Sequence, residues 1–405
     1  TVGVVFLLNI LEYLLAPISV ILVVKKLSVV DFGFYGLLST VLGLSATLFG
    51  LGLNLYNFKN IPGKPAEEQY RILKTTLGLQ LAASVGGAVL ISVVLRKDLI
   101  EYGLIVLFSL KIVITVINGE FLRFLGLQKK ITAKSIIGFV DSKLWLFALF
   151  VFFLFGNVSV RNIYISQVLG SILTVVVILL LMDRKLLLGS GLDKSVALDA
   201  LKYSLPLIII DIGQYLLEMG DRYIIKVFCD YTQLGYYTFA YNWIRIILKF
   251  GMLLLYVMQP YISESYNMMK EKGDFHSQRF YSFFRISIKY SLTILISGLV
   301  FFLANFSQIV MVVGRPEYQN TISTAIFLGF FPVFMFLSYF AHIVSVLQGK
   351  IKQVTICYLV AAGFNVVLNI VLIGRMGING AALSTVITYV LLFLFILRSI
   401  DVDFA

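Results

Sequence analysis

The sequence is poor in charge, cysteine, histidine and proline. Charged residues make up only 13% of the 405 positions, and the chain contains two cysteines, two histidines and seven prolines. Cys229 and Cys357 lie far apart and have no CxxC or Cys/His spacing around them, which argues against a disulfide framework or a zinc site. His276 and His342 are isolated as well. We therefore expect no bound metal and no cofactor.

The motifs of common enzyme classes are also missing. The sequence has no GxSxG, no Walker A and no HExxH. Without a nucleotide site, any work that the protein does must draw on an ion gradient, the membrane potential or consumption of its substrate elsewhere. We therefore expect that the protein is not an enzyme. A membrane enzyme that polymerises or ligates glycans stays an alternative, but it would be expected to carry a sizeable outer loop, and the predicted outer loops are short.

Apolar residues are what the chain has in excess. They make up 60% of the sequence, and the mean hydropathy is +0.95, whereas soluble domains are about 45–50% apolar and about 25% charged. Apolar runs of roughly 20 residues, enough helix to cross the hydrocarbon core, recur along the chain. The fold class expected is therefore all-α, a polytopic membrane protein with about twelve transmembrane helices. Their approximate ranges are 2–24, 32–55, 75–95, 99–118, 136–155, 163–182, 203–227, 234–259, 283–306, 321–347, 354–373 and 380–398.

The distribution of basic residues predicts the orientation of these helices. We number each loop after the predicted helix that it follows. Lysine and arginine are much more frequent in the even-numbered loops than in the odd-numbered ones. Because basic residues collect in cytoplasmic loops, both termini are expected in the cytoplasm. Twelve helices require both termini on one side of the membrane, so the helix count agrees with the charge distribution. The net charge of +12 is explained by these loops, so we expect no nucleic-acid partner.

Two short similarities indicate an internal repeat. A Gly-x-Tyr within residues 31–35 recurs within 233–237, and the Leu-Gln of residues 127–130 recurs within 347–350. Each pair falls in equivalent loops of the two halves. The pattern predicts an N-terminal six-helix lobe at 1–182, a cytoplasmic linker at 183–202 and a C-terminal six-helix lobe at 203–405. Six helices per lobe give a parallel pseudo-two-fold repeat, with its axis along the membrane normal and a cavity between the lobes.

The longest loop, about 260–282, mixes tyrosine, phenylalanine and methionine with charged residues. We expect it to form an amphipathic helix on the cytoplasmic surface.

Charged residues inside apolar helices mark the candidate site, because a charge at the bilayer centre costs about 2.5–3.5 kcal/mol on insertion scales. One polar stripe at three- and four-residue spacing runs along the predicted helix 203–227, and a second runs along 234–259. Such stripes should face each other or a watery cavity. The first contains Asp211, Gln214, Tyr215, Glu218 and Arg222, and the second contains Tyr241, Arg245 and Lys249.

A purely structural alternative accounts for some of these charges. Glu218 with Arg222, and Asp221 beside them, could form local ion pairs that fix helices to one another. Arg245 and Lys249 have no acidic residue one turn away, which favours a binding role. We treat Asp221 and Arg222 as candidates for an ion pair or a gate.

Four further intramembrane charges lie in the first half. Glu12 is a candidate for the cavity, and so is Lys111, which shares a short polar stripe with Thr115 and Asn118. Asp141 is a third ion-pair or gating candidate, whereas the nearby Lys143 can extend its ammonium toward the membrane surface.

Several stretches resemble the polysaccharide flippases. Gly220-Asp221-Arg222-Tyr223 and the segment 234–241 are similar to the helix 7–8 signature of these proteins. The segments 365–369 and 377–385 are similar to their N…LN…GxxGAAxAT pattern, with Ser384 where the pattern has alanine. The resemblance covers nearly the whole chain. It places the sequence near Wzx-like O-antigen flippases of the superfamily that includes multidrug, oligosaccharidyl-lipid and polysaccharide exporters.

The resemblance implies a protein of the plasma (inner) membrane that moves a polyprenyl-pyrophosphate-linked oligosaccharide from the cytoplasmic to the outer leaflet for polysaccharide, O-antigen or capsule biosynthesis. It also implies a V-shaped pair of bundles, a cationic cavity and alternating access. The expected partners are the lipid-linked substrate and the bilayer, with polysaccharide assembly proteins as further candidates. Arg245, Lys249 and Lys111 would hold the pyrophosphate, while Asp211, Glu218 and the tyrosines would bind sugar hydroxyls. The alternative is a multidrug or small-cation antiporter of the same superfamily, which would favour an acidic cavity.

Overall fold

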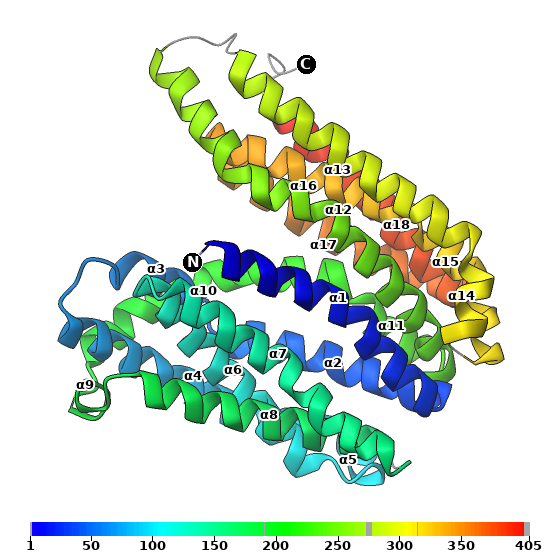
Figure 1. The fold of residues 1–405 in the computed structure, drawn as a ribbon, viewed down its shortest axis with the longest axis horizontal. Coiled ribbons are helices and arrows are strands. Elements are labelled where there is room, and N and C mark those ends of the chain that lie inside the picture. Colours follow the sequence, from blue (N-terminus) through cyan, green and yellow to red (C-terminus); the bar gives the residue numbers. More distant parts are fainter. Residues whose placement is uncertain (1, 157, 190, 273–277, 314, 401–405) are drawn as a thin grey trace. The chain divides into compact units, whose positions relative to one another are not determined.

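The computed structural model describes residues 2–156, 158–189, 191–272, 278–313 and 315–400, and in these ranges the regular structure is entirely helical (Figure 1). The first half contains α1 (Val2–Lys26), α2 (Val29–Phe49), α3 (Leu53–Asn60), α4 (Ala66–Val94), α5 (Arg96–Glu101), α6 (Ile105–Leu127), α7 (Ile131–Leu154), α8 (Val160–Leu181) and α9 (Arg184–Gly189). The second half contains α10 (Lys194–Met219), α11 (Asp221–Phe228), α12 (Tyr231–Lys272), α13 (Gln278–Ala304), α14 (Phe306–Val313), the 3₁₀ helix η1 (Pro316–Thr321), α15 (Ile322–Leu328), α16 (Phe331–Leu347), α17 (Ile351–Met376) and α18 (Ile378–Ser399).

Ten helical stretches in the described residues are long and apolar enough to cross a membrane. Helices α1 and α10, with 25 and 26 residues, are also long enough. Asp211 and Glu218 make α10 less apolar. Large apolar side chains such as Val94, Val106 and Phe155 are more than 70% exposed, as expected for surfaces that face lipid. The predicted all-α polytopic membrane fold is confirmed.

Two predicted helices are interrupted. The helix expected at 203–227 breaks at Gly220 into α10 and α11, and the one expected at 321–347 breaks between α15 and α16. Pro332, in the first turn of α16, has no N–H to donate to a preceding turn. The amphipathic surface helix expected at 260–282 is wrong for its first part, because α12 continues unbroken to Lys272. Residues 273–277 lie outside the described residues.

The helices group by their contacts into two units. Unit 1 contains Thr1–Ser19 and Leu37–Tyr215, and unit 2 contains Val20–Gly36 and Leu216–Ala405. Helices α1, α2 and α10 therefore each pass from one unit to the other. The lobe boundaries at residues 182 and 203 stay a prediction.

Unit 1 is built around an apolar cluster between α4, α6, α7 and α8. Tyr70 and Phe124 are buried there with a ring-centroid distance of 5.2 Å, and Ile137 and Ile178 complete it. Helix α7 lies alongside α8, and α4 alongside α6 (Figure 1). Leu186 of α9 and Val196 of α10 also pack against the cluster. The predicted linker 183–202 is therefore folded onto the unit.

Asp193 caps the start of α10, because its carboxylate accepts hydrogen bonds from backbone N–H groups in the first turn of the helix. Its Oδ1 accepts from the backbone N–H of Ser195 at 2.9 Å and of Val196 at 3.3 Å, and from the Ser195 hydroxyl at 2.6 Å. The hydroxyl bond, followed by the backbone bonds, lowers the pKa of Asp193 below its usual range. This carboxylate fixes where α10 starts.

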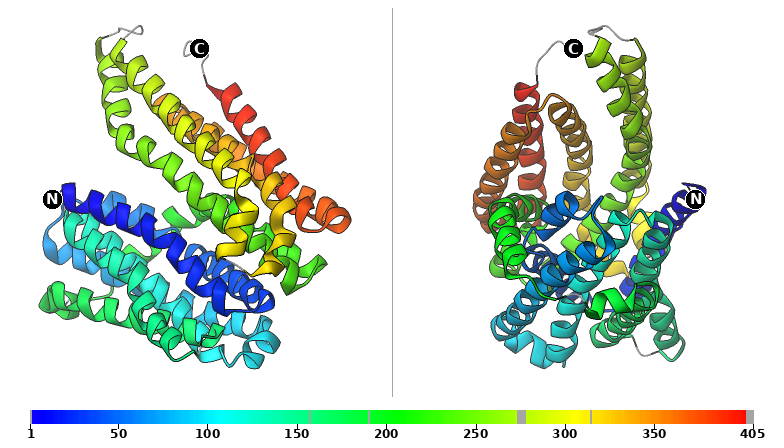
Figure 2. Two further views of the ribbon diagram at one scale, coloured as in Figure 1. Left: turned by 45° about the vertical axis from the view of Figure 1, so that its right-hand side comes forward. Right: turned by 90° about the vertical axis from the view of Figure 1, so that its left-hand side faces the viewer.

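Unit 2 is held together partly by buried polar groups. Helix α12 packs along α13, and α18 lies against both α16 and α17 (Figure 2). The Asn365 amide on α17 donates to the Thr388 hydroxyl on α18 at 3.1 Å, and Asn369 donates to the Asn365 side-chain oxygen at 2.8 Å. The C-terminal motif with its two asparagines is therefore a polar seam between α17 and α18.

The repeated Gly-x-Tyr segments meet inside unit 2, where the start of α2 crosses the start of α12. A Cβ at Gly33 would lie 1.9 Å from the Tyr231 carbonyl oxygen, and one at Gly235 would lie 2.2 Å from the Val29 carbonyl oxygen. Both distances are far shorter than any real Cβ contact. Phe32 and Phe34, which flank Gly33, are buried, and Phe34 packs edge-on against Tyr231 at 5.5 Å. We call this arrangement the glycine crossing. It needs glycine from both helices.

We expect Gly33→Ala and Gly235→Ala each to lower the unfolding temperature of the purified protein in detergent. The added methyl meets backbone atoms that cannot rotate away, and overpacking of this kind costs about 1–3 kcal/mol. Gly86→Ala is the matched control, because a Cβ at Gly86 meets nothing within 4 Å. Equal melting temperatures for all three variants would contradict the close approach.

Candidate functional site

A half-exposed ion pair lies at the end of α10 in unit 2. The Arg245 guanidinium on α12 contacts the Glu218 carboxylate at 3.3 Å, and the two side chains are 38% and 35% exposed. The Tyr241 hydroxyl, one turn before Arg245, donates to the Glu218 carbonyl at 3.1 Å. No acidic residue lies one turn from Arg245 on its own helix, and its partner Glu218 comes from α10. At this point the two polar stripes face each other.

A second, fully buried ion pair lies just beyond it. Arg222 contacts Asp221 at 2.9 Å, with side chains 3% and 4% exposed. The Tyr237 hydroxyl donates to the other carboxylate oxygen of Asp221. The Arg222 guanidinium lies over the Tyr241 ring at 4.2 Å from its centroid. The local pair considered between Glu218 and Arg222 is wrong, because the break at Gly220 separates the two residues and each finds another partner.

We expect Asp221→Ala to destabilise the protein by about 3–5 kcal/mol, because it leaves Arg222 buried without its counter-charge. The double variant Asp221→Ala/Arg222→Ala should lose less than the sum of the single variants, measured by unfolding in detergent. Glu68→Ala is the control, since it removes one partner of the half-exposed Lys64–Glu68 pair, and such pairs contribute at most about 1 kcal/mol. Additive losses would show that the Asp221–Arg222 pair has no coupling.

The remaining candidates of the two stripes divide between the units. Lys249 is exposed one turn after Arg245 on α12. Asp211 and Tyr215 belong to unit 1. The Tyr215 hydroxyl donates to the Thr40 carbonyl at 2.5 Å, and its ring packs where a Cβ on Gly43 would lie. Tyr215 therefore fastens α10 to α2, and its predicted role in substrate binding stays a prediction.

Two of the candidates in the first half lie in one polar cluster. Lys111 on α6 donates to the Ser171 hydroxyl on α8 at 2.7 Å, and Asn118 donates to Asp141 on α7 at 2.8 Å. Asn118 also donates to the Ser171 carbonyl at 3.2 Å, and Asp141 is the carboxylate whose field acts on Lys111. These contacts join three helices. Such a cluster serves packing as well as it would serve a ligand.

Glu12 lies apart from that cluster. Its side chain is half-buried on α1, and its carboxylate is the charged group whose field acts on Lys143 of α7. The expectation that Lys143 simply reaches for the membrane surface is incomplete, because an opposite charge lies within its range.

The sequence analysis missed the most buried carboxylate in this part of the chain, Glu120. Asn57 and Gln80 donate to its two oxygens at 2.7 and 3.1 Å, and Arg123 contacts it at 3.2 Å. Glu120 is fully buried, whereas the Arg123 side chain is 43% exposed. Arg123 is also the cation whose field acts on Asp211. The spacing of Glu120 and Arg123 by three residues was the available signal, but their amide partners come from α3 and α4.

We expect Glu120→Ala to lower stability by on the order of 2–3 kcal/mol, because two buried amides lose their acceptor. Glu120→Gln keeps one acceptor oxygen and should lose less. The check is the unfolding midpoint of each variant in detergent, with Glu101→Ala as the control at an exposed position on α5. If Glu120→Ala were as stable as Glu101→Ala, the network would be unimportant for stability.

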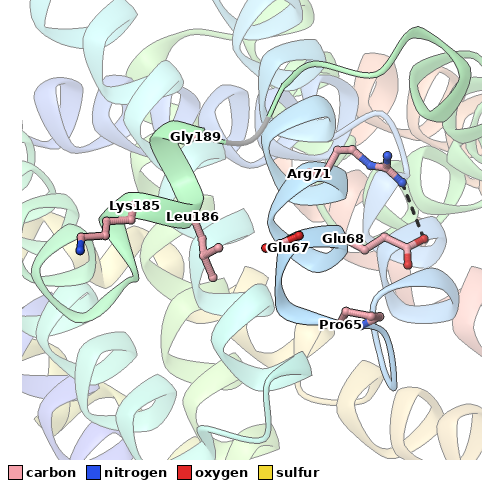
Figure 3. Close-up of a pocket in the computed structure, with 7 residues that line it drawn as sticks. All are labelled: Pro65, Glu67, Glu68, Arg71, Lys185, Leu186 and Gly189. Atoms are coloured by element: carbon pink, nitrogen blue, oxygen red, sulfur yellow. Dashed lines mark ion pairs between the residues drawn. The ribbon is translucent and has the colours of Figure 1, made fainter.

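The structure also has a charged surface pocket apart from the candidate residues. It lies in unit 1 between the start of α4 and α9 and encloses about 520 Å³. Glu67, Glu68, Arg71 and Lys185 line it, and Arg71 contacts Glu68 at 3.9 Å (Figure 3). Acidic and basic side chains alternate there, so the pocket does not select one sign of charge.

No group of three or more histidine, cysteine, aspartate and glutamate side chains is placed to hold a metal ion in the part of the chain that the structure describes. Cys229 and Cys357 are both free thiols.

Comparison with known proteins identifies the kind of molecule that this arrangement belongs to. The model of the polysaccharide biosynthesis protein family matches residues 1–266. No curated protein matches the chain in sequence.

Solved structures share the fold at low sequence identity. The lipid II flippase MurJ, in an inward closed conformation, is 16% identical, with a TM-score of 0.76 over 99% of this chain and 88% of that one. An inward-facing multidrug resistance MATE family transporter of the MOP superfamily is 14% identical, with a TM-score of 0.75 over 96% and 93%. A MOP superfamily transporter from Pyrococcus furiosus is 13% identical, with a TM-score of 0.53 over 98% and 93%. All three are flippases or transporters, not enzymes.

Proposed function

Since the chain belongs to the polysaccharide biosynthesis protein family, we propose that it moves a polyprenyl-pyrophosphate-linked oligosaccharide from the cytoplasmic to the outer leaflet. The product would serve O-antigen, capsule or related polysaccharide assembly. The fold it shares with a lipid II flippase supports transport of a lipid-linked sugar. The observation that carries the proposal is Arg245, a half-exposed arginine within an apolar helix, one turn before the exposed Lys249.

Two cations one turn apart fit a pyrophosphate. The guanidinium binds phosphate oxygens through two parallel hydrogen bonds, and the ammonium adds a point charge. A half-exposed charge inside an apolar helix must face a polar cavity rather than lipid. We therefore assign Arg245 and Lys249 to the pyrophosphate, while the polyprenyl tail stays in the bilayer.

The ion pair with Glu218 changes how that site would work. In the structure, Glu218 neutralises part of the charge that Arg245 would offer. A pyrophosphate carries more charge than one carboxylate, so it would compete with Glu218 for the guanidinium. Once displaced, Glu218 becomes an acceptor for sugar hydroxyls, the role that we also propose for Asp211. The pair would thus keep the cation oriented before the substrate arrives.

The proposal extends to location, mechanism and partners. The excess of basic residues in the even-numbered loops supports an inner or plasma membrane protein with both termini in the cytoplasm. Transport would proceed by alternating access of the substrate cavity to the two sides. Polysaccharide assembly proteins would act on the delivered substrate.

A multidrug or small-cation antiporter is the second candidate function. The structural likeness to a MATE transporter favours it, and so do the acidic side chains Asp211 and Glu218. An antiporter for cationic drugs would depend on these carboxylates, and removing Arg245 would not impair it.

The decisive test is accumulation of lipid-linked oligosaccharide, resolved by leaflet, in cells depleted of this protein. We expect build-up on the cytoplasmic leaflet, relieved by the wild-type protein and at least about tenfold less by Arg245→Ala/Lys249→Ala, because both cations would be lost. Arg285→Ala/Lys289→Ala is the matched control, since these exposed cations are also one turn apart, on α13.

If Arg245→Ala/Lys249→Ala relieved the build-up as well as the control variant does, the flippase proposal would stand, but Arg245 and Lys249 would not belong to the binding site. An absence of build-up, together with drug sensitivity of the depleted cells, would favour the antiporter.

A further inference from the structure

Three half-buried rings lie side by side on α16 and α17 in unit 2. Tyr339 and His342 are stacked, with centroids 6.2 Å apart and planes 9° from parallel. Tyr358 meets His342 edge-on at 5.7 Å and 75°. All three retain partial exposure, unlike most aromatic residues of this unit's interior. We call these three residues the ring wall.

A second row of rings, fully buried, begins on the same helix α16. Tyr241 and Phe331 are stacked at 5.3 Å, and Phe331 lies 5.8 Å from Tyr389. None of these three side chains is more than 3% exposed. Their close packing fixes the start of α16 against α12 and α18.

Helix α16 links the ring wall to the Glu218–Arg245 pair. The helix carries Tyr339 and His342, and Phe331 in its first turn stacks on Tyr241 of α12. Tyr241, in the buried row, donates to the Glu218 backbone. The rings and the ion pair therefore border one region of unit 2. The half-exposed charges show that this region is polar rather than lipid-filled.

Polar atoms along the wall lack partners. His342 Nδ1 is buried and has no hydrogen-bond partner in the described part of the chain. The hydroxyl of Ser345, one turn further on α16, is fully buried and equally without one. An orphaned polar atom costs about 1–3 kcal/mol, so such atoms next to an accessible surface point to a ligand that supplies the missing bonds.

The chemistry of the wall fits a sugar. A pyranose has a flat face of C–H groups and a rim of hydroxyls, which donate and accept hydrogen bonds. The faces of Tyr339 and Tyr358 would cover the C–H face, while His342 would bond a hydroxyl of the rim. A lipid tail offers no hydrogen bonds, and a cationic drug would need more than the single carboxylate of Glu218, which is already paired.

We propose that the ring wall is the glycan subsite of the transporter, and that it receives the sugar next to the pyrophosphate. The inference rests on the proposed function, and it assigns sugar recognition to Tyr339, His342 and Tyr358. The cations on α12 would recognise the lipid pyrophosphate in any form. The ring wall would distinguish a glycosylated lipid from a bare one.

The test compares binding of two probes to the purified protein in detergent, followed by intrinsic fluorescence. One is polyprenyl pyrophosphate without sugar, and the other is the polyprenyl-pyrophosphate-linked oligosaccharide extracted from cells depleted of the protein. Wild type should bind the glycosylated probe more tightly. Tyr339→Ala/Tyr358→Ala should weaken that binding by about fivefold to 160-fold, toward the affinity for the bare lipid, since each of the two aromatic contacts contributes about 0.5–1.5 kcal/mol.

Further variants separate ring contact from hydrogen bonding. Tyr339→Phe/Tyr358→Phe keeps both rings and should retain most of the preference. His342→Phe keeps a ring but cannot form a hydrogen bond with a hydroxyl, so it should lose part of the preference for the glycosylated probe. Tyr290→Ala, an exposed tyrosine on α13, is the matched control and should bind as wild type does. A melting curve of each apoprotein shows whether the variant is folded.

The outcomes distinguish this inference from the proposed function. If wild type bound both probes equally, or if Tyr339→Ala/Tyr358→Ala kept the full preference, the ring wall would not be a glycan subsite while the flippase proposal stood. If neither probe bound, the proposed function would fail and this inference with it. Loss of both probes in Arg245→Ala/Lys249→Ala, with loss of the preference alone in the ring-wall variant, supports both.

Discussion

Hydrocarbon cannot solvate an ionised side chain, and this constraint governs where the polar residues of the protein lie. Glu120 accepts from two amides and pairs with Arg123, Asp221 pairs with Arg222 under a tyrosine hydroxyl, and Lys111 donates to Ser171. Each arrangement draws its members from different helices or from the two sides of a helix break. These polar contacts therefore hold the helices together. Removal of one member leaves its partner without a counter-charge or hydrogen bond in a medium that cannot solvate it.

Exposure separates these ties from the candidate site. The Asp221–Arg222 pair is buried, with all its bonds made inside the protein, so it is suited to hold a structure in place. The Glu218–Arg245 pair is more than one-third exposed on both sides, so water or a ligand can reach it. The same residue types thus serve two purposes on either side of Gly220. The two pairs differ in whether water or a ligand can reach the charged groups.

The glycine crossing shows the opposite principle, in which absence of a side chain permits contact. Gly33 and Gly235 bring the backbones of α2 and α12 so close that any Cβ would overlap a carbonyl oxygen. The two glycines belong to the repeated Gly-x-Tyr segments, and each leaves room for a backbone carbonyl of the other helix. Small residues are the means by which helices approach closely in a membrane, where the hydrophobic effect adds little to their association.

The sequence by itself determined the class of the protein and the positions of most helices, because a span needs about twenty apolar residues and such runs are visible in one dimension. It also determined which charges were costly enough to need an explanation. Only the tertiary structure decided their partners, since Glu218 finds Arg245 on another helix and Glu120 finds amides on α3 and α4. Helical spacing describes neighbours along one helix. It carries no information on which face of which other helix lies opposite.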